Sequence, residues 1–290
     1  MKGIAVTAFL GLAAGLAATA LQDQEPEFKT TAVAGSVHMI DSGVAGNIGV
    51  SVGVDGVLMI DDQFARFAPA IREQMEAIGA GAPRFLVNTH WHGDHTGGNL
   101  EFGGAATILA QDNVRKRLLA GDGRTPPAEK AALPVLTYDD RVTLHFNGEE
   151  IEVYALGPGH TDGDSIVWFK DSKVVHLGDH FFSGRFPYID LDSGGDVAGF
   201  VENTRRLLEM LPDDAKLIPG HGPLSTKDDL RQTLRMLETT TALVRERIEQ
   251  GMTELECGDA GLPEEWATWS WNFITTKRWL RLCHRSFTAD

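Results

Sequence analysis

The sequence predicts an α/β protein in which two β-sheets pack face to face and helices cover their outer sides. Runs typical of strands are interleaved with segments of helical periodicity. The strands fall into two similar blocks separated by a helical stretch, which favours two packed sheets. No stretch has the composition of a linker between domains. We therefore expect residues 21–290 to form a single domain.

Short apolar runs, alternating or continuous, predict the strands, and turn-forming residues separate them. In the first block these runs lie at residues 31–34, 37–40, 48–54, 56–60, 85–87 and 107–109. In the second block they lie at residues 136–154, 165–169, 174–177 and 216–218. Asn147 and Gly148 mark a hairpin turn in the second block. An exposed loop is expected at residues 121–127, where Gly and Pro interrupt the pattern.

Apolar residues that recur every three or four positions predict the helices. These helices are expected at residues 64–78, from near Gly97, at 112–119, after Asp196 as the capping residue, and at 230–248. The tail, residues 263–287, carries four of the six tryptophans. We expect this tail to be an amphipathic helix packed on the body of the protein rather than a membrane or ligand-binding element.

Residues 1–20 have the pattern of a signal peptide that is cleaved. Lys2 is followed by an apolar stretch at residues 4–16 and by small residues at 18–20. Because the apolar stretch is short for a membrane span and polar residues follow it, export to the periplasm or medium is favoured over an N-terminal anchor. Export would place Cys257 and Cys283 in an oxidising compartment, where a disulfide can form.

The composition also excludes several classes of partner. The formal net charge is −15, which argues against nucleic acid or an anionic membrane surface. Hydrophobic residues make up 42% and charged residues 23% of the chain, so neither a disordered chain nor a coiled coil is indicated. We expect the partner to be a small-molecule substrate.

The most informative motif is H-x-H-x-D-H at residues 90–95, directly after the apolar run at 85–87. Imidazole and carboxylate groups are ligands that suit zinc. Alternate residues at a strand end point to one side, so His90 and His92 can bind one metal. Asp94 and His95 follow the bend at Gly93 and are free to point elsewhere. The motif therefore suggests two adjacent metal positions.

Three later turns carry further candidate ligands: Gly-His-Thr at 159–161, Gly-Asp-His at 178–180 and Pro-Gly-His-Gly at 219–222. Each turn directly follows an apolar strand, at the strand end where open sheets usually place ligands. The glycine beside each candidate lets the backbone approach a crowded site.

Together these motifs resemble the metallo-β-lactamase superfamily over about residues 33–227. The resemblance implies a four-layer αββα sandwich with two zinc ions per chain at one edge between the sheets. For the first metal it implies the ligands His90, His92 and His160. For the second metal it implies the ligands Asp94, His95 and His221. It also implies that Asp179 is the bridging carboxylate.

Other residues near the motifs are expected to support the site. Asp61 resembles the early aspartate that supports the metals from behind. His180 is expected behind the ligands or in the pocket wall. Trp91, Phe181 and Phe182 flank ligands, so each is expected either in an apolar pocket wall or in the core.

Such a site implies hydrolysis. Two cations held close together lower the pKa of a shared water and give hydroxide near neutral pH. That hydroxide would attack a carbonyl group, with Asp94 as the catalytic residue that orients it and moves a proton. The sequence has no G-x-S-x-G motif that would suggest a serine nucleophile.

Export and the spacing of the later turns favour a β-lactamase-like enzyme that opens a cyclic amide. Two departures separate the chain from the subclass with a cysteine ligand: Asp179 replaces that cysteine, and His95 is an additional ligand. Phe182 stands where that subclass often has a lysine and where homoserine-lactone lactonases tend to have a tyrosine. Arg185 is the nearest cation that can substitute.

Three alternatives remain open at this point. The first is a lactonase or thioesterase of the same superfamily. The second is an iron-dependent sulfur dioxygenase, which shares several ligands and which metal analysis distinguishes from a zinc hydrolase. The third is a metal-stabilised binding module without turnover.

Overall fold

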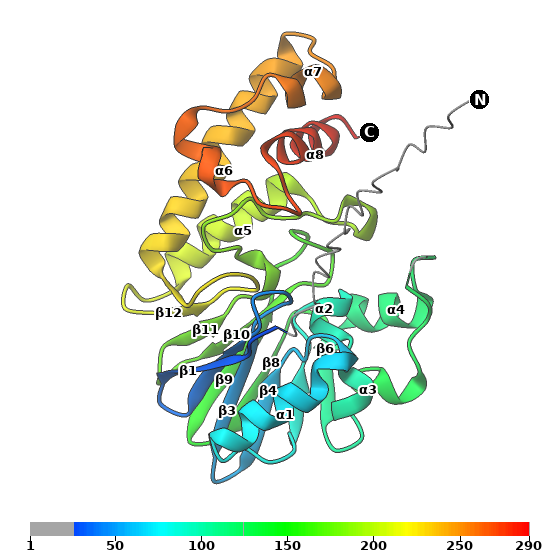
Figure 1. Cartoon of the computed structure of the whole chain (residues 1–290), viewed down its shortest axis with the longest axis vertical. Coiled ribbons are helices and arrows are strands. Elements are labelled where there is room, and N and C mark those ends of the chain that lie inside the picture. Colours follow the sequence, from blue (N-terminus) through cyan, green and yellow to red (C-terminus); the bar gives the residue numbers. More distant parts are fainter. Residues whose placement is uncertain (1–25, 124, 290) are drawn as a thin grey trace, which may run out of the picture.

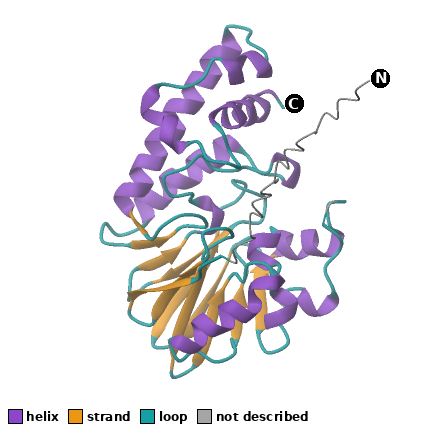
Figure 2. Cartoon of the chain, viewed as in Figure 1, coloured by secondary structure: helices purple, strands orange, loops and turns teal. Residues whose placement is uncertain are grey.

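Two β-sheets pack face to face with helices on their outer sides in the computed structural model, which describes residues 26–123 and 125–289 (Figures 1 and 2). The first sheet has seven strands and the second has six. The predicted single-domain αββα sandwich is therefore confirmed. The expected signal peptide, residues 1–20, lies outside the described residues.

The first sheet follows the order of the chain from β1 to β7. Its strands are β1 (Lys29–Ala34), β2 (Val37–Asp41), β3 (Ile48–Gly53), β4 (Gly56–Ile60), β5 (Phe85–Val87), β6 (Thr107–Gln111) and β7 (Leu136–Tyr138). Strands β1 to β4 form antiparallel pairs, whereas β4 to β7 run parallel to one another. The carboxyl ends of β4, β5 and β6 therefore meet at one edge of the sheet.

The second sheet has the order β13-β12-β11-β10-β9-β8. Its strands are β8 (Arg141–Phe146), β9 (Glu149–Ala155), β10 (Ser165–Phe169), β11 (Val174–His176), β12 (Lys216–Ile218) and β13 (Ser225–Thr226). Asn147 and Gly148 both have positive φ, 53° and 77°, between β8 and β9. The predicted hairpin turn is confirmed, because a two-residue turn of this type requires left-handed backbone at both positions.

Helices cover both outer faces. Four lie on the side of the first sheet: α1 (Ala68–Ala77), α2 (Gly93–Thr96), α3 (Asn99–Phe102) and α4 (Asp112–Ala120). Four gather beyond the second sheet: α5 (Val197–Met210), α6 (Lys227–Glu249), α7 (Glu254–Asp259) and α8 (Thr276–Thr288). Five short 3-10 helices lie at Ala65–Phe67, Lys130–Ala132, Gly178–His180, Leu191–Ser193 and Glu264–Trp269. Asp196 caps α5 by accepting from Gly199 N at 2.6 Å, as its sequence position predicts.

The helix expected near Gly97 differs from the prediction. Two one-turn helices replace it, and the first begins at Gly93, within the metal-binding motif itself. His92 is extended at the start of that helix, and its carbonyl accepts from His95 N and Thr96 N. The motif is therefore a strand-to-helix turn rather than a loop before a helix.

The apolar core of the described residues forms five clusters, and two of them lie under α5 and beside α4. Between the sheets, residues such as Leu58, Val87 and Val167 form one buried cluster. A second cluster lies under α1. A third lies among α5, α6, α7 and α8 and contains buried Trp266 and Trp279. We call residues 227–288 the C-terminal unit.

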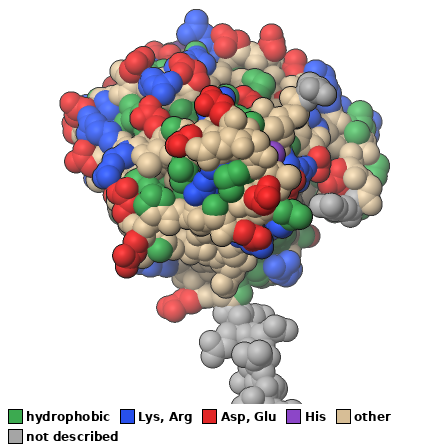
Figure 3. All heavy atoms as spheres, turned by 90° about the horizontal axis from the view of Figure 1, so that it is seen from above, with side chains coloured by type: hydrophobic (Ala, Val, Ile, Leu, Met, Phe, Trp, Pro, Cys, Tyr) green, Lys and Arg blue, Asp and Glu red, His purple; other side chains and the backbone are tan. Residues whose placement is uncertain are grey.

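The described residues contain no helix that is long and apolar enough to cross a membrane. Charged side chains of both signs are interspersed over the face seen from above (Figure 3).

Candidate metal centre

Hydrogen bonds fix the turn after β5 just before His90, the first candidate ligand. Asn88 and Asn99 exchange two side-chain hydrogen bonds, at 3.0 and 2.9 Å, across the base of the turn. Thr89 donates to Asp61 from its backbone N and its hydroxyl, both at 2.7 Å. These contacts fix the backbone from which the histidines project.

His90, His92 and His160 form a first cluster, in which three ring nitrogens face one another. His92 Nδ1 lies 3.2 Å from His90 Nε2 and 2.8 Å from His160 Nε2. Ligand atoms of these residues and of Asp179 all lie within 4.8 Å of one another. The turns after β5 and β9 thus bring together residues about 70 positions apart, with His92 and His160 separated by 68.

Asp94, His95 and His221 form a second cluster beside the first. Their ligand atoms also lie within 4.8 Å of one another. The Asp94 carboxylate lies 3.3 Å from His221 Nε2 and 3.7 Å from His95 Nε2. His221 comes from the turn after β12, and this turn is pinned where Asn47 donates to the carbonyls of Pro219 and Gly222.

Asp179 lies between the two clusters, on the turn after β11. Its Oδ2 is 3.3 Å from His160 Nε2 and 3.9 Å from His90 Nε2. Its Oδ1 is 3.1 Å from His95 Nε2 and 3.4 Å from His221 Nε2. The carboxylate therefore faces both clusters, which is the placement that the sequence resemblance implies for a bridging ligand.

Glycine is required where the backbone passes closest to this centre. A Cβ at residue 220 would lie 2.0 Å from Asp179 Oδ1, and a Cβ at residue 46 would lie 2.2 Å from the His95 ring. Side chains at these two positions would displace the candidate ligands. The glycine expected beside His221 thus has a steric reason.

The loop that contains Tyr188 and Asp190 contacts the ring nitrogens of His160 and His92 that point away from the cluster. His160 Nδ1 donates to the Tyr188 carbonyl at 2.7 Å, and His92 Nε2 lies 2.9 Å from Asp190 Oδ2. A hydrogen bond at one ring nitrogen fixes the tautomer and leaves the other nitrogen as a lone-pair donor. Tyr188 and Asp190 therefore aim these two histidines at the centre of the cluster.

Asp61 orients His95 of the second cluster, which is the supporting role that the sequence resemblance implies for Asp61. Asp61 Oδ2 accepts from His95 Nδ1 at 2.7 Å and also accepts the Thr89 hydroxyl. That hydroxyl lies 3.1 Å from His90 Nδ1, so a single buried carboxylate connects the two clusters from behind. Asp61 has a φ of 58°, a left-handed conformation that is strained outside glycine and is often found near functional sites.

Burial and charge shift the histidine pKa values in opposite directions. Burial is the main cause that lowers the pKa of His160 to about 4, and it also holds the pKa of His90 well below the ordinary range. At His221 burial is outweighed by Asp179 and Asp94, which raise its pKa to about 9. Carboxylates likewise outweigh burial at His95 and raise its pKa well above the ordinary value.

The donor set fits metal ions. The first cluster offers imidazole nitrogens that face one another, and facing lone pairs repel unless a cation or proton lies between them. Within the described residues, buried His95 Nε2 and Asp179 Oδ1 have no hydrogen-bond partner, although they lie 3.1 Å apart. Nitrogen and oxygen atoms that lack a hydrogen-bond partner and point toward one position are arranged as the ligands of a zinc ion are.

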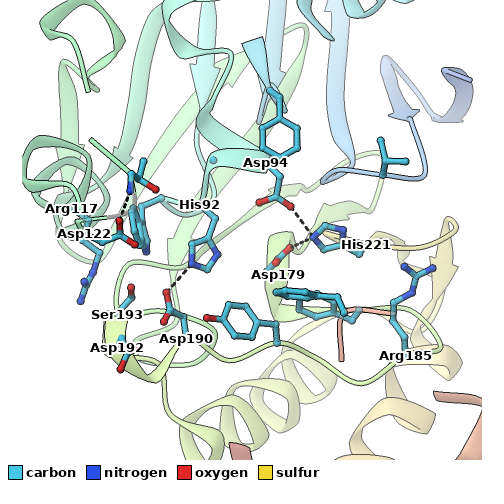
Figure 4. Close-up of a pocket in the computed structure, with 18 of the residues that line it drawn as sticks. His92, Asp94, Arg117, Asp122, Asp179, Arg185, Asp190, Asp192, Ser193 and His221 are labelled. Carbon is cyan, nitrogen blue, oxygen red and sulfur yellow. Dashed lines mark hydrogen bonds and ion pairs between the residues drawn. The ribbon is translucent and has the colours of Figure 1, made fainter. Parts of the chain in front are cut away.

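A cavity of about 1040 Å³ opens onto the candidate metal centre. In Figure 4, Arg185 lies on the His221 side of the cavity, whereas Arg117 and Asp122 lie on the His92 side. The predicted pocket residues Trp91, Phe182 and Arg185 all line this cavity. Phe182 stacks on His221 with ring centroids 5.1 Å apart.

Phe181 and His180 do not line the cavity. Phe181 is fully buried in the apolar cluster under α5, so it packs the core rather than the pocket. His180 is also buried, and its Nε2 lies 3.8 Å from Asp164 Oδ2, behind the His160 turn. Burial lowers the pKa of His180 to about 3. Of its two predicted positions, His180 occupies the one behind the ligands.

The residues that line the cavity and that the sequence prediction missed include Tyr188, Asp190, Trp271 and Phe273. The prediction of one amphipathic helix over the tail is wrong for its first part, because a 3-10 helix (Glu264–Trp269) and the loop at 270–275, which carries Trp271, precede α8. Trp266 and Trp269 are buried in the C-terminal unit as expected, but Trp271 lines the cavity. The spacing of the four tryptophans departs from one helical stripe at Trp271, and this departure was the available signal.

Comparison with known proteins agrees with this geometry. The chain is 24% identical over 79% of its length to 2,4-dinitroanisole O-demethylase subunit alpha of Nocardioides sp. (strain JS1661), covering 68% of that protein. It is 30% identical over 67% of its length to hydroxyacylglutathione hydrolase of Methylococcus capsulatus (strain ATCC 33009 / NCIMB 11132 / Bath), covering 71% of that protein.

A solved structure shows the same fold. The metallo-beta-lactamase from Pontibacter korlensis superposes with a TM-score of 0.61 at 19% identity, over 73% of this chain and 99% of that one. The sequence profile of the metallo-beta-lactamase superfamily matches residues 40–221, which include every candidate ligand. The chain therefore belongs to the metallo-beta-lactamase superfamily of metal-dependent hydrolases.

Proposed function

We propose that this protein is an exported dinuclear zinc hydrolase that opens a cyclic amide, with β-lactamase-like activity. The observation that carries the proposal is the Asp179 carboxylate, which faces two clusters of candidate ligands at once. A site for one structural zinc ion needs four ligands, whereas seven converge here. The arrangement therefore favours two ions and a catalytic role.

The candidate ligands divide by cluster. One zinc ion would be held by His90, His92 and His160, the other by Asp94, His95 and His221, and both by Asp179. When bound, the two ions would supply hydroxide near neutral pH and polarise a carbonyl oxygen.

Asp94 is suited to orient the attacking water. Both Asp94 and Asp179 line the cavity, and the Asp94 side chain is the more exposed of the two, 27% against 5%. Burial opposes ionisation of Asp94, but His95 and His221 overcome it and hold its pKa well below the ordinary value. The carboxylate is therefore ionised at neutral pH and able to accept a hydrogen bond that orients the attacking water.

Arg185 is the candidate anchor for a substrate carboxylate. Its guanidinium lies 5.1 Å from the Trp271 ring centroid and is half-buried at the cavity wall. Burial lowers its pKa, and the nearby Asp41 carboxylate offsets this only in part. Among the described residues Arg185 forms no ion pair with a carboxylate, Asp41 included. A cation without a close counter-ion in a cavity fits a bidentate carboxylate ligand, and β-lactams carry one.

Hydrolysis of a thioester or lactone is the second candidate. Asp179 resembles the bridging carboxylate of glyoxalase II-like enzymes and lactonases, and hydroxyacylglutathione hydrolase is among the relatives. The name of another relative, an O-demethylase, describes cleavage of a different bond. An iron-dependent dioxygenase would use a similar donor set, so metal identity separates it from both hydrolases.

The test combines metal quantification with a panel of chromogenic β-lactam, lactone and thioester substrates. Two zinc ions per chain and β-lactam turnover are expected. One iron per chain would overturn the zinc hydrolase, and turnover of thioesters or lactones alone would replace the cyclic amide. Metal binding without turnover of any substrate would indicate a binding module.

Two variants sharpen this test. Arg185→Ala should raise KM for a β-lactam at least about tenfold while Arg185→Lys retains part of the affinity, because a charged hydrogen bond is lost in the first and kept in the second. Unchanged KM in Arg185→Ala would remove Arg185 as the anchor. Export predicts that the mature chain begins at Leu21, which mass spectrometry of periplasmic or secreted protein checks.

A further inference from the structure

We propose that an aromatic rim, formed by Tyr188, Phe273 and Trp271, is a substrate subsite for a planar aromatic group. This inference rests on the proposed function, in which the substrate bond is cleaved at the candidate metal centre beside the rim. It adds a substrate class: acyl compounds that carry an aromatic ring as well as a carboxylate. Nothing in the ligand motifs requires such a subsite.

The aromatic rim forms a continuous arc around the mouth of the candidate metal centre. Tyr188 stacks on His92 with ring centroids 5.9 Å apart and contacts Phe273 edge to face at 5.2 Å. Phe273 contacts Trp271 at 5.6 Å, and Trp271 lies 6.4 Å from His221. All five rings line the same cavity. The rim thus runs from a ligand of the first cluster to a ligand of the second.

Hydrogen bonds hold the aromatic rim in place. Trp271 Nε1 donates to the Phe186 carbonyl at 2.9 Å, which fixes the indole ring. Arg278 Nη1 donates to the Phe273 carbonyl at 2.8 Å, and its guanidinium lies 4.3 Å from the Phe273 ring centroid. Binding to this rim would cost little entropy for ordering its side chains, because hydrogen bonds already hold them in place.

Phe273 exposes apolar surface in spite of these contacts. Its exposed fraction is 45%, and it is the single aromatic residue among the exposed large hydrophobic residues of the described chain. Trp266 and Trp269, in the same segment, are buried in the C-terminal unit. A purely packing role accounts for those two tryptophans. Packing does not explain why Trp271 and Phe273, the next two aromatic residues, line the cavity.

The position of Arg185 defines the ligand further. Arg185 lies on the His221 side of the cavity in Figure 4 and stacks against Trp271 at 5.1 Å. A carboxylate on Arg185 and an aromatic ring on the rim can therefore belong to one small ligand. Trp271 and Phe273 follow the region that matches the superfamily, which ends at residue 221. The C-terminal unit therefore contributes two of the three rim residues, and Tyr188 comes from the region that matches the superfamily.

The test is a binding measurement that needs no turnover. Isothermal titration of zinc-loaded protein compares phenylsuccinate with methylsuccinate, which share the carboxylates and differ in the ring. Wild-type protein should bind phenylsuccinate about tenfold more tightly, since aromatic contacts add to the area buried. Phe273→Ala should reduce this preference about three- to tenfold and leave methylsuccinate affinity within about twofold. Trp271→Phe, which keeps a ring, should reduce it less.

Leu255→Ala is the matched control, because Leu255 is an exposed apolar residue of the C-terminal unit, 59% exposed, that does not line the cavity. This variant should keep the wild-type preference. Equal affinity for the two acids in wild-type protein, or a preference that survives in Phe273→Ala, would overturn the subsite. If the preference holds but no substrate of the panel is hydrolysed, the proposed function fails while the subsite stands.

Discussion

The two clusters of the candidate metal centre use the same kinds of ligand but hold them in opposite electrostatic states. In the first cluster, burial keeps the pKa of His160 at about 4 and that of His90 well below the ordinary range. In the second cluster, nearby carboxylates raise the pKa of His221 to about 9 and that of His95 well above the ordinary value.

The difference follows from how many carboxylates each cluster faces. The first cluster faces Asp179, and the bond from Asp190 lies on its outer side. The second faces Asp179, contains Asp94 and is backed by Asp61. In the first cluster His90 and His160 thus offer neutral imidazoles ready to bind a cation. The second attracts a cation through charge and must release protons when it binds one.

The largest effect is expected where the two clusters share a ligand. Asp179→Ala should reduce bound zinc from two ions to one or none and lower kcat/KM by at least about 100-fold, more than the loss of an outer contact. Metal quantification and substrate turnover on the same preparation check this. Asp179→Cys is the matched control and should retain metal, because a thiolate is also a zinc ligand. Unchanged metal content in Asp179→Ala would exclude Asp179 as a ligand.

Removal of Asp94 should affect one cluster only. Asp94→Ala is expected to lower turnover by about 100-fold or more, the usual range for loss of a general acid–base group, while the first cluster keeps its metal. Turnover, metal content and circular dichroism together separate this outcome from unfolding. Retained activity in a variant with normal metal content would remove Asp94 from the mechanism.

Asp190 and Asp192 allow a sharper test of the first cluster. Asp190→Asn should weaken metal binding there by about 10- to 100-fold, because the amide no longer accepts the His92 Nε2 proton as a carboxylate does. Competition with a chelator measures the affinity, and the absorption spectrum of cobalt-substituted protein reports the ligand geometry. Asp192 lines the same cavity but is exposed, so Asp192→Asn should match wild-type protein. Equal losses in both variants would point to a general charge effect.

The two packed sheets and the candidate ligands could be predicted because local patterns mark them, whereas the division of the ligands between two metals came from the resemblance to the superfamily. Short apolar runs ending in Gly and His place each candidate ligand at a strand end, and strand ends meet at one edge of a sheet. His160 and His221 were predicted in this way, and the structure brings both into the centre. For Phe181, adjacency alone could not decide between the pocket wall and the core, because successive residues can point to opposite sides.

Asp190, Trp271 and Phe273 were missed for a different reason. Asp190 reaches His92 across 98 residues, and no motif surrounds it. Trp271 and Phe273 come from a tail whose other tryptophans pack the C-terminal unit. Whether an aromatic residue faces a core or a cavity depends on how distant segments pack, and no local spacing encodes that packing.

The smallest expected effect tests the electrostatic difference between the clusters in metal-free protein. His160 has a folded-state pKa of about 4, below its ordinary 6.5, so the unfolded chain takes up a proton that the folded chain refuses. The stability that this neutral histidine contributes is present above pH 6.5 and is lost as the pH falls through 4. His221, with a folded-state pKa of about 9, contributes stability that is present below pH 6.5 and is lost as the pH rises through 9.

Thermal unfolding in the presence of a chelator should therefore show a decline in Tm on both the acidic and the alkaline side. About 1 kcal/mol changes Tm by 2–4 °C in a domain of 150–250 residues, so shifts of a few degrees are expected. His160→Gln should make the acidic decline smaller and leave the alkaline decline unchanged, and His221→Gln should do the reverse. The two clusters lie on either side of Asp179. If one variant reduced both declines, the two clusters would titrate as one unit, and the electrostatic difference between them would be disproved.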